Sequence, residues 1–177
     1  MKPENCLIDI RGHVKLADFG SCIRMDDRDL VSSIETVGTP DYIPPEVLRS
    51  HEGKISYGRE CDWWSVGVVI YELLYDEVPF FSESLAEVYA KIMDYEVRMR
   101  LNTCSYLLTH TQRYLCFPEE PIISDDAKDL IRKLLCDKES RLGRRGSHEI
   151  KGHPFFSGIN WTSVRQSPLT AQNSIQK

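Results

Sequence analysis

Two short segments near the start of the chain are mostly apolar. The segments Cys6–Asp9 and Val14–Ala17 enclose residues 10–13, a connection of hairpin length that contains a glycine. Short apolar segments of this kind predict strands, and the short connection predicts an antiparallel hairpin. Residues 18–60 show no sustained periodicity and are rich in Gly, Pro, Ser and Asp, so we expect one long ordered loop with short turns. A loop of that length inside a compact domain is usually functional.

The most apolar stretch of the chain lies at residues 62–75 and leaves almost no polar face. A helix that is apolar nearly all round is buried, so we expect a central helix here, in a region ended by Pro79. Hydrophobic residues recur at helical spacing over residues 84–97, which predicts an amphipathic helix. The inward face of this second helix comprises Leu85, Val88, Tyr89 and Ile92.

Two further helices are predicted in the last third of the chain. Ser124 is a good N-cap, and the two aspartates after it favour the positive end of a helix dipole. We expect that helix to run to about Cys136 and a short helix to cover residues 147–152. After Gly158 the chain turns polar.

The order of these elements is a hairpin, a long loop and then helices, without βαβ alternation and without an internal repeat. We therefore predict an α+β fold, mainly helical, with a small β-hairpin at its edge. The compact domain is expected to cover residues 1–157, and a flexible tail is expected at residues 158–177.

Composition narrows the classes of function. The 177 residues are 41% hydrophobic and 28% charged, which is ordinary for a globular domain. The net charge of -5 argues against nucleic acid and anionic membranes as partners and is compatible with basic peptide partners. No apolar run reaches the ~18 residues of a membrane span, and the first residues resemble neither a signal peptide nor a transit peptide. The six cysteines form no C-x-x-C pair, so reduced thiols in a cytoplasmic protein are favoured over a zinc or redox site.

The first candidate chemistry lies at the two ends of the predicted hairpin. A Lys-Pro-Glu-Asn run at residues 2–5 precedes the first strand, and an Asp-Phe-Gly run at residues 18–20 follows the second. A tight turn between two strands brings Asn5 and Asp18 close together in space. Their amide and carboxylate oxygens suit Mg²⁺, and Lys2 adds the positive charge that phosphoryl transfer needs. Each run alone is equally typical of a surface turn, whereas the two at this spacing are a much stronger signal.

Three more motifs follow in order along the chain. They are Gly-Thr-Pro-Asp-Tyr at 38–42 with Pro-Pro-Glu at 44–46, Asp-Trp-Trp-Ser-Val-Gly at 62–67, and Arg-Leu-Gly at 141–143 with His-Pro-Phe-Phe at 153–156. Taken singly, these residues are typical of turn prolines, a helix-cap aspartate or a solvated arginine. Taken together and in this order, they make an unrelated helical domain with chance motifs the weakest interpretation.

On these motifs the chain resembles serine/threonine protein kinases of the AGC group. The resemblance covers about residues 1–165, with residues 101–116 as the exception. It implies the C-terminal lobe of a kinase, with the N-terminal lobe absent from the chain. The amino-acid sequence at residues 17–22, 37–42 and 60–65 is similar to that of the myotonic-dystrophy-kinase-related branch of this group.

The resemblance implies that ATP and Mg²⁺ are the cofactors. Asp18 matches the aspartate that holds magnesium, and Asn5 matches the second metal ligand. Phe19 and Gly20 complete the cofactor-binding motif, in which the packing of the Phe distinguishes active from inactive states. Lys2 matches the catalytic-loop lysine near the transferred phosphate.

Other matched residues concern the substrate and the architecture. Thr39 matches the threonine that bonds the catalytic Asp and Lys and marks serine/threonine specificity. Glu72 matches a position where basophilic relatives hold a substrate arginine, which implies protein substrates with basic residues near the Ser or Thr. Glu46 and Arg141 match a buried ion pair, and Asp62 matches the helix aspartate that anchors the catalytic-loop backbone.

The chain departs from the family pattern at its start. A kinase catalytic loop has His-Arg-Asp, four residues and then Asn, and counting back five positions from Asn5 falls just before Met1. We therefore expect the isolated chain to be inactive, because it also lacks the Gly-rich loop and the ATP-pairing Lys. The alternative function is a non-catalytic peptide- or partner-binding module with a docking surface around Thr39 and Glu72. Regulatory partners are expected to contact regions outside this chain.

The long loop departs from the pattern as well. Glu35 stands four residues before Thr39, where many relatives carry a phosphorylated Ser or Thr. A glutamate has one charge where phosphate has about two, so Glu35 is either a partial mimic or an ordinary solvated residue. Ser32, Ser33 and Thr36 are also candidate phosphorylation sites.

Residues 101–116 are unusually apolar for a loop insert. A partner-binding insert is one interpretation, and a gene-model or splicing artefact, which also fits the abrupt start at Met1, is the favoured one. Leu7, Leu16 and Phe19 are expected to be exposed, because the upper lobe of a kinase normally covers this hairpin.

Overall fold

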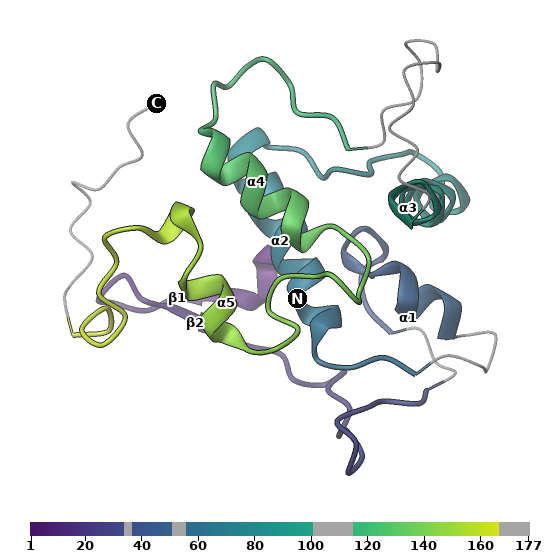
Figure 1. Ribbon diagram of the computed structural model, residues 1–177, viewed down its shortest axis with the longest axis horizontal. Coiled ribbons are helices and arrows are strands. Elements are labelled where there is room, and N and C mark those ends of the chain that lie inside the picture. The colour runs from purple at the N-terminus through teal and green to yellow at the C-terminus, as the bar shows by residue number, and fades with distance from the viewer. Residues whose placement is uncertain (34–36, 51–55, 101–114, 167–177) are drawn as a thin grey trace.

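The fold is described from a computed structural model, which covers residues 1–33, 37–50, 56–100 and 115–166. Figure 1 shows helices α2 and α4 in the middle of the molecule, with α1 and α3 on one side and the hairpin and α5 on the other. The elements, with 3-10 turns written η, are η1 (Pro3–Asn5), β1 (Cys6–Ile8), β2 (Val14–Leu16), η2 (Pro40–Tyr42), α1 (Pro45–Ser50), α2 (Glu60–Tyr75), α3 (Leu85–Arg100), α4 (Asp125–Leu134), α5 (Ser147–Lys151) and η3 (Pro154–Phe156).

The predicted hairpin is confirmed, with each strand one residue shorter than expected. Strands β1 and β2 pair antiparallel, with Cys6 opposite Leu16. The Gly12 N–H donates to the Asp9 carbonyl oxygen at 2.8 Å and closes the turn, in which Gly12 takes a φ of 84°. A left-handed φ of this size favours glycine, which explains the glycine in the connection.

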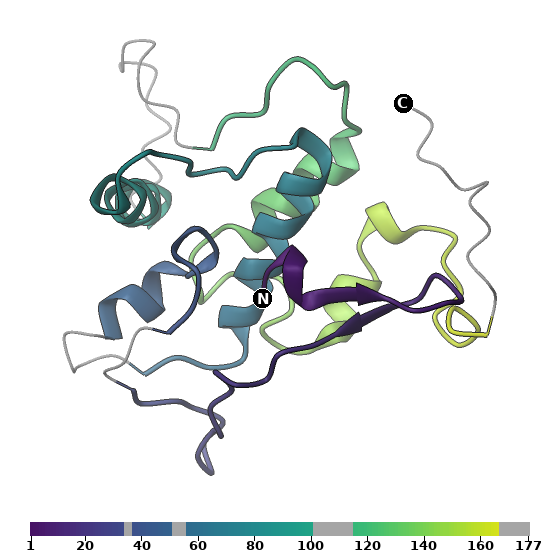
Figure 2. The ribbon, with the colours of Figure 1, turned by 180° about the vertical axis from the view of Figure 1, so that it is seen from behind.

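The hairpin lies at the edge of the molecule, as Figure 2 shows. Its apolar side chains face solvent, with exposed fractions of 55% for Leu7 and 47% for Leu16. Phe19, just after the hairpin, is 63% exposed. The expected exposure of these three residues is therefore confirmed.

Helix α2 packs against α4 through a glycine. A Cβ atom built on Gly67 would lie 2.8 Å from the Leu134 Cβ and 2.9 Å from the Leu135 Cδ2, closer than real Cβ contacts allow. Trp64 and Val68, on neighbouring turns of α2, are completely buried. The central, buried helix predicted from the sequence is confirmed on this face.

The prediction that α2 is buried all round is wrong on its other face, since Leu73 is 69% exposed. Leu85, which was expected on the inward face of α3, is 53% exposed, whereas Ile92 on the same helix is completely buried. The covered face of α2 is the one where the Trp64 ring stacks on Phe80, with 5.7 Å between centroids. Burial follows the position of these packing partners, which hydrophobicity alone does not specify.

The long loop at residues 18–60 contains a helix that its sequence pattern did not reveal. Helix α1 begins at Pro45, a residue suited to the first helical turn, and buries Glu46. A helix of six residues is too short for a periodic pattern to be read. Within the same stretch, Val31 and Tyr57 form an isolated antiparallel bridge, in which the Val31 N–H donates to the Tyr57 carbonyl oxygen at 2.8 Å.

The predicted N-cap of α4 is confirmed, because the Ser124 hydroxyl oxygen accepts the Ala127 N–H at 3.3 Å. The helix ends at Leu134, two residues before the predicted end at Cys136, since the Leu135 ψ of 63° is outside the helical range. The short helix predicted near residues 147–152 is present as α5. Across the described ranges, no helix combines the length and apolarity needed to cross a membrane.

Candidate active site

Residues from four separate motifs line one cleft. The cleft has a volume of about 740 Å³ and lies between the first residues of the chain, the loop after β2 and the N-terminal half of α2. The site residues expected from the sequence that lie on its wall are Lys2, Asn5, Asp18, Phe19, Thr39 and Asp62.

The hairpin register explains how Asn5 and Asp18 reach the same cleft. Strand pairing continues one residue beyond the strands, because the Ala17 N–H donates to the Asn5 carbonyl oxygen at 2.8 Å. Asp18 then turns away with a φ of 57°, a conformation that aspartate tolerates better than most residues. Its Oδ1 accepts the Gly20 N–H at 3.3 Å, so the three residues of the Asp-Phe-Gly run form a local turn.

Lys2 and Asn5 are placed by the short turn η1. The Asn5 N–H donates to the Lys2 carbonyl oxygen at 3.1 Å, and Pro3 occupies the first position of the turn. Within the described ranges, neither the Lys2 ammonium nor the Asn5 side-chain amide bonds to a protein group. Both groups are therefore available to a ligand.

The donor set in this part of the cleft is compatible with Mg²⁺. Asn5 offers an amide oxygen and Asp18 a carboxylate, and Mg²⁺ in proteins is usually held by one or two carboxylates together with water and substrate phosphates. No group of three or more His, Cys, Asp or Glu in the described part of the chain is arranged to hold a metal. Asn5 and Asp18 would therefore hold an ion only with oxygens from a ligand or from water.

Thr39 and Asp62 lie on the cleft wall, but no hydrogen bond joins them to Lys2 or to another described residue of the 1–5 segment. Thr39 precedes η2, and its carbonyl oxygen accepts the Tyr42 N–H at 3.1 Å. Asp62 is exposed in the first turn of α2, where a carboxylate stabilises the helix dipole. The roles expected for Thr39 and Asp62 remain predictions.

Glu72 lies on α2 outside the wall of the cleft and is bonded to the loop. The Tyr42 hydroxyl donates to the Glu72 Oε2 at 2.7 Å, and the Tyr42 carbonyl oxygen accepts the hydroxyl of buried Ser65 at 2.8 Å. Burial, together with the hydrogen bond to Glu72, raises the pKa of Tyr42, so its hydroxyl stays protonated and continues to donate. Nothing in the sequence pattern indicates Tyr42 as the partner of Glu72, although a buried tyrosine normally needs a partner for its hydroxyl.

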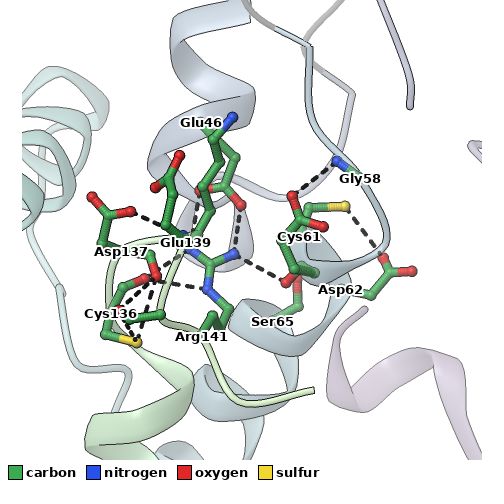
Figure 3. Close-up of polar contacts among 12 residues, drawn as sticks. Glu46, Gly58, Cys61, Asp62, Ser65, Cys136, Asp137, Glu139 and Arg141 are labelled. Atoms are coloured by element: carbon green, nitrogen blue, oxygen red, sulfur yellow. Dashed lines mark hydrogen bonds and ion pairs between the residues drawn. The ribbon is translucent and has the colours of Figure 1, made fainter. Parts of the chain in front are cut away.

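The expected ion pair between Glu46 and Arg141 is present and deeply buried (Figure 3). The Arg141 Nη1 and Nη2 atoms lie 2.5 and 3.0 Å from the two Glu46 carboxylate oxygens, and both side chains are at most 3% exposed. The remaining guanidinium N–H groups donate to the carbonyl oxygens of Cys136, at 2.9 and 3.2 Å, and Glu60, at 3.0 Å. All five donors of Arg141 are therefore satisfied inside the protein. This cluster joins α1, α2 and the segment after α4.

Cys22 and Cys61 also line the cleft. Burial, reinforced by the nearby Asp62 carboxylate, raises the pKa of Cys61 to about 12. Cys61 is therefore a neutral thiol at physiological pH and a poor nucleophile.

The candidate phosphorylation residues are only partly covered by the structure. Ser32 is exposed and Ser33 is half-buried. Glu35 and Thr36 lie outside the described residues, as do positions 101–114 of the apolar insert.

Comparison with known proteins identifies the family. A family profile described as the protein kinase domain matches residues 1–156. The serine/threonine-protein kinase MRCK beta of Homo sapiens is 48% identical over 167 residues, which is 93% of this chain and 9% of the relative. The serine/threonine-protein kinase Genghis Khan of Drosophila melanogaster is 48% identical over 169 residues, 95% of this chain and 10% of the relative. The chain thus spans about a tenth of the length of the curated relatives it matches. It belongs to the protein kinase family, and its relatives are the MRCK, or myotonic-dystrophy-kinase-related, serine/threonine kinases of the AGC group.

Proposed function

We propose that the chain is the C-terminal lobe of a cytoplasmic serine/threonine protein kinase that transfers the γ-phosphate of ATP to Ser or Thr of protein substrates. The observation that carries this proposal is the convergence of Lys2, Asn5 and Asp18 on one cleft at the two ends of the hairpin. Membership of the kinase family supports the type of reaction. The side chains of Lys2 and Asn5, which bond to no described protein group, support the cleft as the location of the site.

In the proposed site, Asn5 and Asp18 would hold Mg²⁺, with further oxygens supplied by the phosphates of ATP. The bound ion supplies neutralisation of the charge on the transferring phosphoryl group. Lys2 adds a second positive charge on the same wall of the cleft. Catalysis of this kind depends on positioning and electrostatics more than on covalent chemistry, so it needs side chains that are held in place but not saturated.

Glu72 is the proposed determinant of basic substrates. Its Oε2 is held by Tyr42, and no ion pair within the described ranges engages its carboxylate. An arginine binds a carboxylate through charge-assisted hydrogen bonds, so a substrate arginine near the phosphorylated residue is a suitable ligand. Partners that regulate the kinase are proposed to contact other parts of the protein.

The test joins this chain to a kinase N-terminal segment that supplies the Gly-rich loop, the ATP-pairing Lys and the catalytic aspartate, and it measures phosphorylation of a basic serine peptide. Asp18→Ala is expected to lower kcat at least ~100-fold, because it removes a charged metal ligand. The matched control Asp27→Ala removes the same charge from an exposed position off the cleft wall and should leave kcat unchanged. Full activity of the Asp18→Ala variant would exclude the proposed magnesium role.

The contact between Tyr42 and Glu72 favours a second candidate, a peptide-binding module without catalysis. This contact does not involve Asn5 or Asp18. The second candidate predicts that the joined protein transfers no phosphate. It also predicts that the chain binds basic peptides with an affinity that Glu72→Gln lowers and Asp18→Ala does not change.

A further inference from the structure

A second concave site, which we call the hairpin-turn pocket, lies at the far end of the hairpin from the cleft. It has a volume of about 460 Å³ and is lined by Asp9, Ile10, Arg11, His13, Lys15 and Arg165. Its walls are the turn between β1 and β2 and the chain that follows η3, which lie next to each other in Figures 1 and 2.

The hairpin-turn pocket is positively charged, although the whole chain has a net charge of -5. Its one carboxylate is already engaged, because the Asp9 Oδ1 accepts the N–H groups of Arg11 and His13 at 2.9 and 3.0 Å. The Asp9 Oδ2 lies 3.4 Å from the Lys15 Nζ. The hydrogen bond from the His13 backbone, more than any other contact, lowers the pKa of Asp9. The Asp9 carboxylate is therefore an anion that accepts hydrogen bonds within the turn. Its single negative charge offsets only one of the three positive charges of Arg11, Lys15 and Arg165.

Two arginines in the pocket have open guanidinium groups. Neither Arg11 nor Arg165 makes a side-chain hydrogen bond or an ion pair with any residue in the described ranges. Elsewhere on the surface, Arg59 pairs with Asp29 at 2.8 Å. Two open guanidinium groups on neighbouring segments offer the paired donors that match a phosphate group.

Both walls of the pocket are fixed by internal contacts. The Trp161 indole N–H donates to the Lys151 carbonyl oxygen at 3.2 Å, and its ring packs 5.3 Å from the Phe156 ring. The Gln166 N–H then donates to the Ser163 carbonyl oxygen at 2.8 Å, which closes the turn that carries Arg165. A pocket whose walls are ordered in advance loses less entropy when it binds a ligand.

We propose that the hairpin-turn pocket binds the phosphate of a phosphorylated serine or threonine in a peptide segment. Arg11 and Arg165 provide donors for the dianion. Ile10 is fully exposed at the rim and offers an apolar contact to a neighbouring peptide side chain, a feature that a free phosphate does not use. A single pocket on an acidic protein favours a peptide over an anionic membrane, since membrane binding relies on clusters of basic residues.

The test is fluorescence anisotropy with a labelled peptide that carries one phosphoserine between leucines, compared with its unphosphorylated counterpart at ~0.1 M salt. The phosphopeptide is expected to bind at least ~10-fold more tightly, and Arg11→Ala and Arg165→Ala should each weaken its binding about 10-fold. The control Arg24→Ala removes the same charge from an exposed position outside the pocket and should change the affinity less than ~2-fold.

Equal affinity for the two peptides, or an equal loss in Arg24→Ala, would overturn the proposal. Vesicles that contain a phosphatidylinositol phosphate form the second arm, and Arg11-dependent binding to vesicles without binding to the peptide would overturn it too. Thermal unfolding followed by circular dichroism should give all variants the wild-type midpoint. If Arg11→Ala has a lower midpoint of thermal unfolding than wild type, Arg11→Lys replaces it and should retain part of the phosphopeptide affinity.

Discussion

The buried cluster around Arg141 and Glu46 and the cleft that contains Asn5 and Asp18 are both built from kinase motif residues. They differ in how many of their polar side-chain groups have hydrogen-bond partners inside the chain. In the cluster, every N–H of the Arg141 guanidinium has a partner inside the chain, and the Glu46 carboxylate is buried with it. In the cleft, the side chains of Lys2 and Asn5 bond to no described residue, and Asp18 accepts one backbone N–H. Saturation and burial therefore distinguish motif residues that stabilise the fold from those that we propose to contact a ligand.

The comparison predicts the largest loss of stability at Arg141. Arg141→Ala should lower the free energy of unfolding by about 3–5 kcal/mol, because it leaves the Glu46 carboxylate buried without its partner. Urea denaturation measures this change, and the control Arg145→Ala, at an exposed position, should stay within ~0.5 kcal/mol of wild type. A loss below ~1 kcal/mol at Arg141 would mean that saturation and burial do not identify the motif residues that stabilise the fold.

A smaller loss is expected where α2 meets α4. Gly67→Ala should destabilise the protein by about 1–3 kcal/mol, because the added methyl would overlap Leu134 and Leu135. The higher helix propensity of alanine offsets up to ~1 kcal/mol of that loss. On the same helix, Leu73→Ala changes an exposed side chain and should have little effect on the urea midpoint. An increase in stability for Gly67→Ala would mean that the two helices can separate at no cost.

Asp129 is an intermediate case, since it is partly exposed and has partners inside the chain. The hydrogen bond from Lys133, and then that from His153, lower the pKa of Asp129 below its ordinary value of 3.8. The stability that Asp129 contributes is therefore present above about pH 3.8 and is lost as the pH falls through the lower pKa of the folded state.

The corresponding variant is Asp129→Asn. Its stability should be slightly below that of wild type at neutral pH, and the gap should close as the pH falls below about 3.8. Urea denaturation across this range measures the gap, with Glu119→Gln as an exposed control. A stability difference between Asp129→Asn and wild type that stays constant down to the lowest pH would contradict a stabilising role for the Asp129 carboxylate.

The smallest effect on stability is expected in the cleft. Asp18→Asn should change the free energy of unfolding by less than ~0.5 kcal/mol, because Asp18 is exposed and asparagine tolerates its positive φ. Isothermal titration with Mg²⁺ and ATP should nevertheless detect weaker metal-dependent nucleotide binding in the joined kinase. A loss of more than ~1 kcal/mol would place Asp18 with Arg141 among the residues that stabilise the fold.

Local signals accounted for much of the fold. The hairpin follows from two short apolar segments on either side of a connection that contains a glycine, and the start of α4 follows from the N-cap at Ser124. Helix α1 was missed because its six residues contain fewer than two turns. The exposure of Leu73 and Leu85 was missed because the sequence does not show which face of a helix another element covers.

The candidate site was predictable only where short-range geometry decides it. The approach of Asn5 and Asp18 follows from their spacing across a tight turn. The bond between Tyr42 and Glu72 joins residues thirty positions apart with no periodic relation between them. The saturation of Arg141 depends on backbone carbonyl oxygens, whose positions depend on the path of the chain and not on residue type.

Tyr42 is bonded to α2 at two points, Ser65 and Glu72, which are about two helical turns apart. The segment at residues 38–42 is therefore fixed against the helix in both position and rotation. A cation that competes for the Glu72 carboxylate weakens the bond that fixes this segment. By thermodynamic reciprocity, a change that displaces the segment releases the carboxylate for that cation. Cation binding at Glu72 and the position of residues 38–42 are thus thermodynamically coupled.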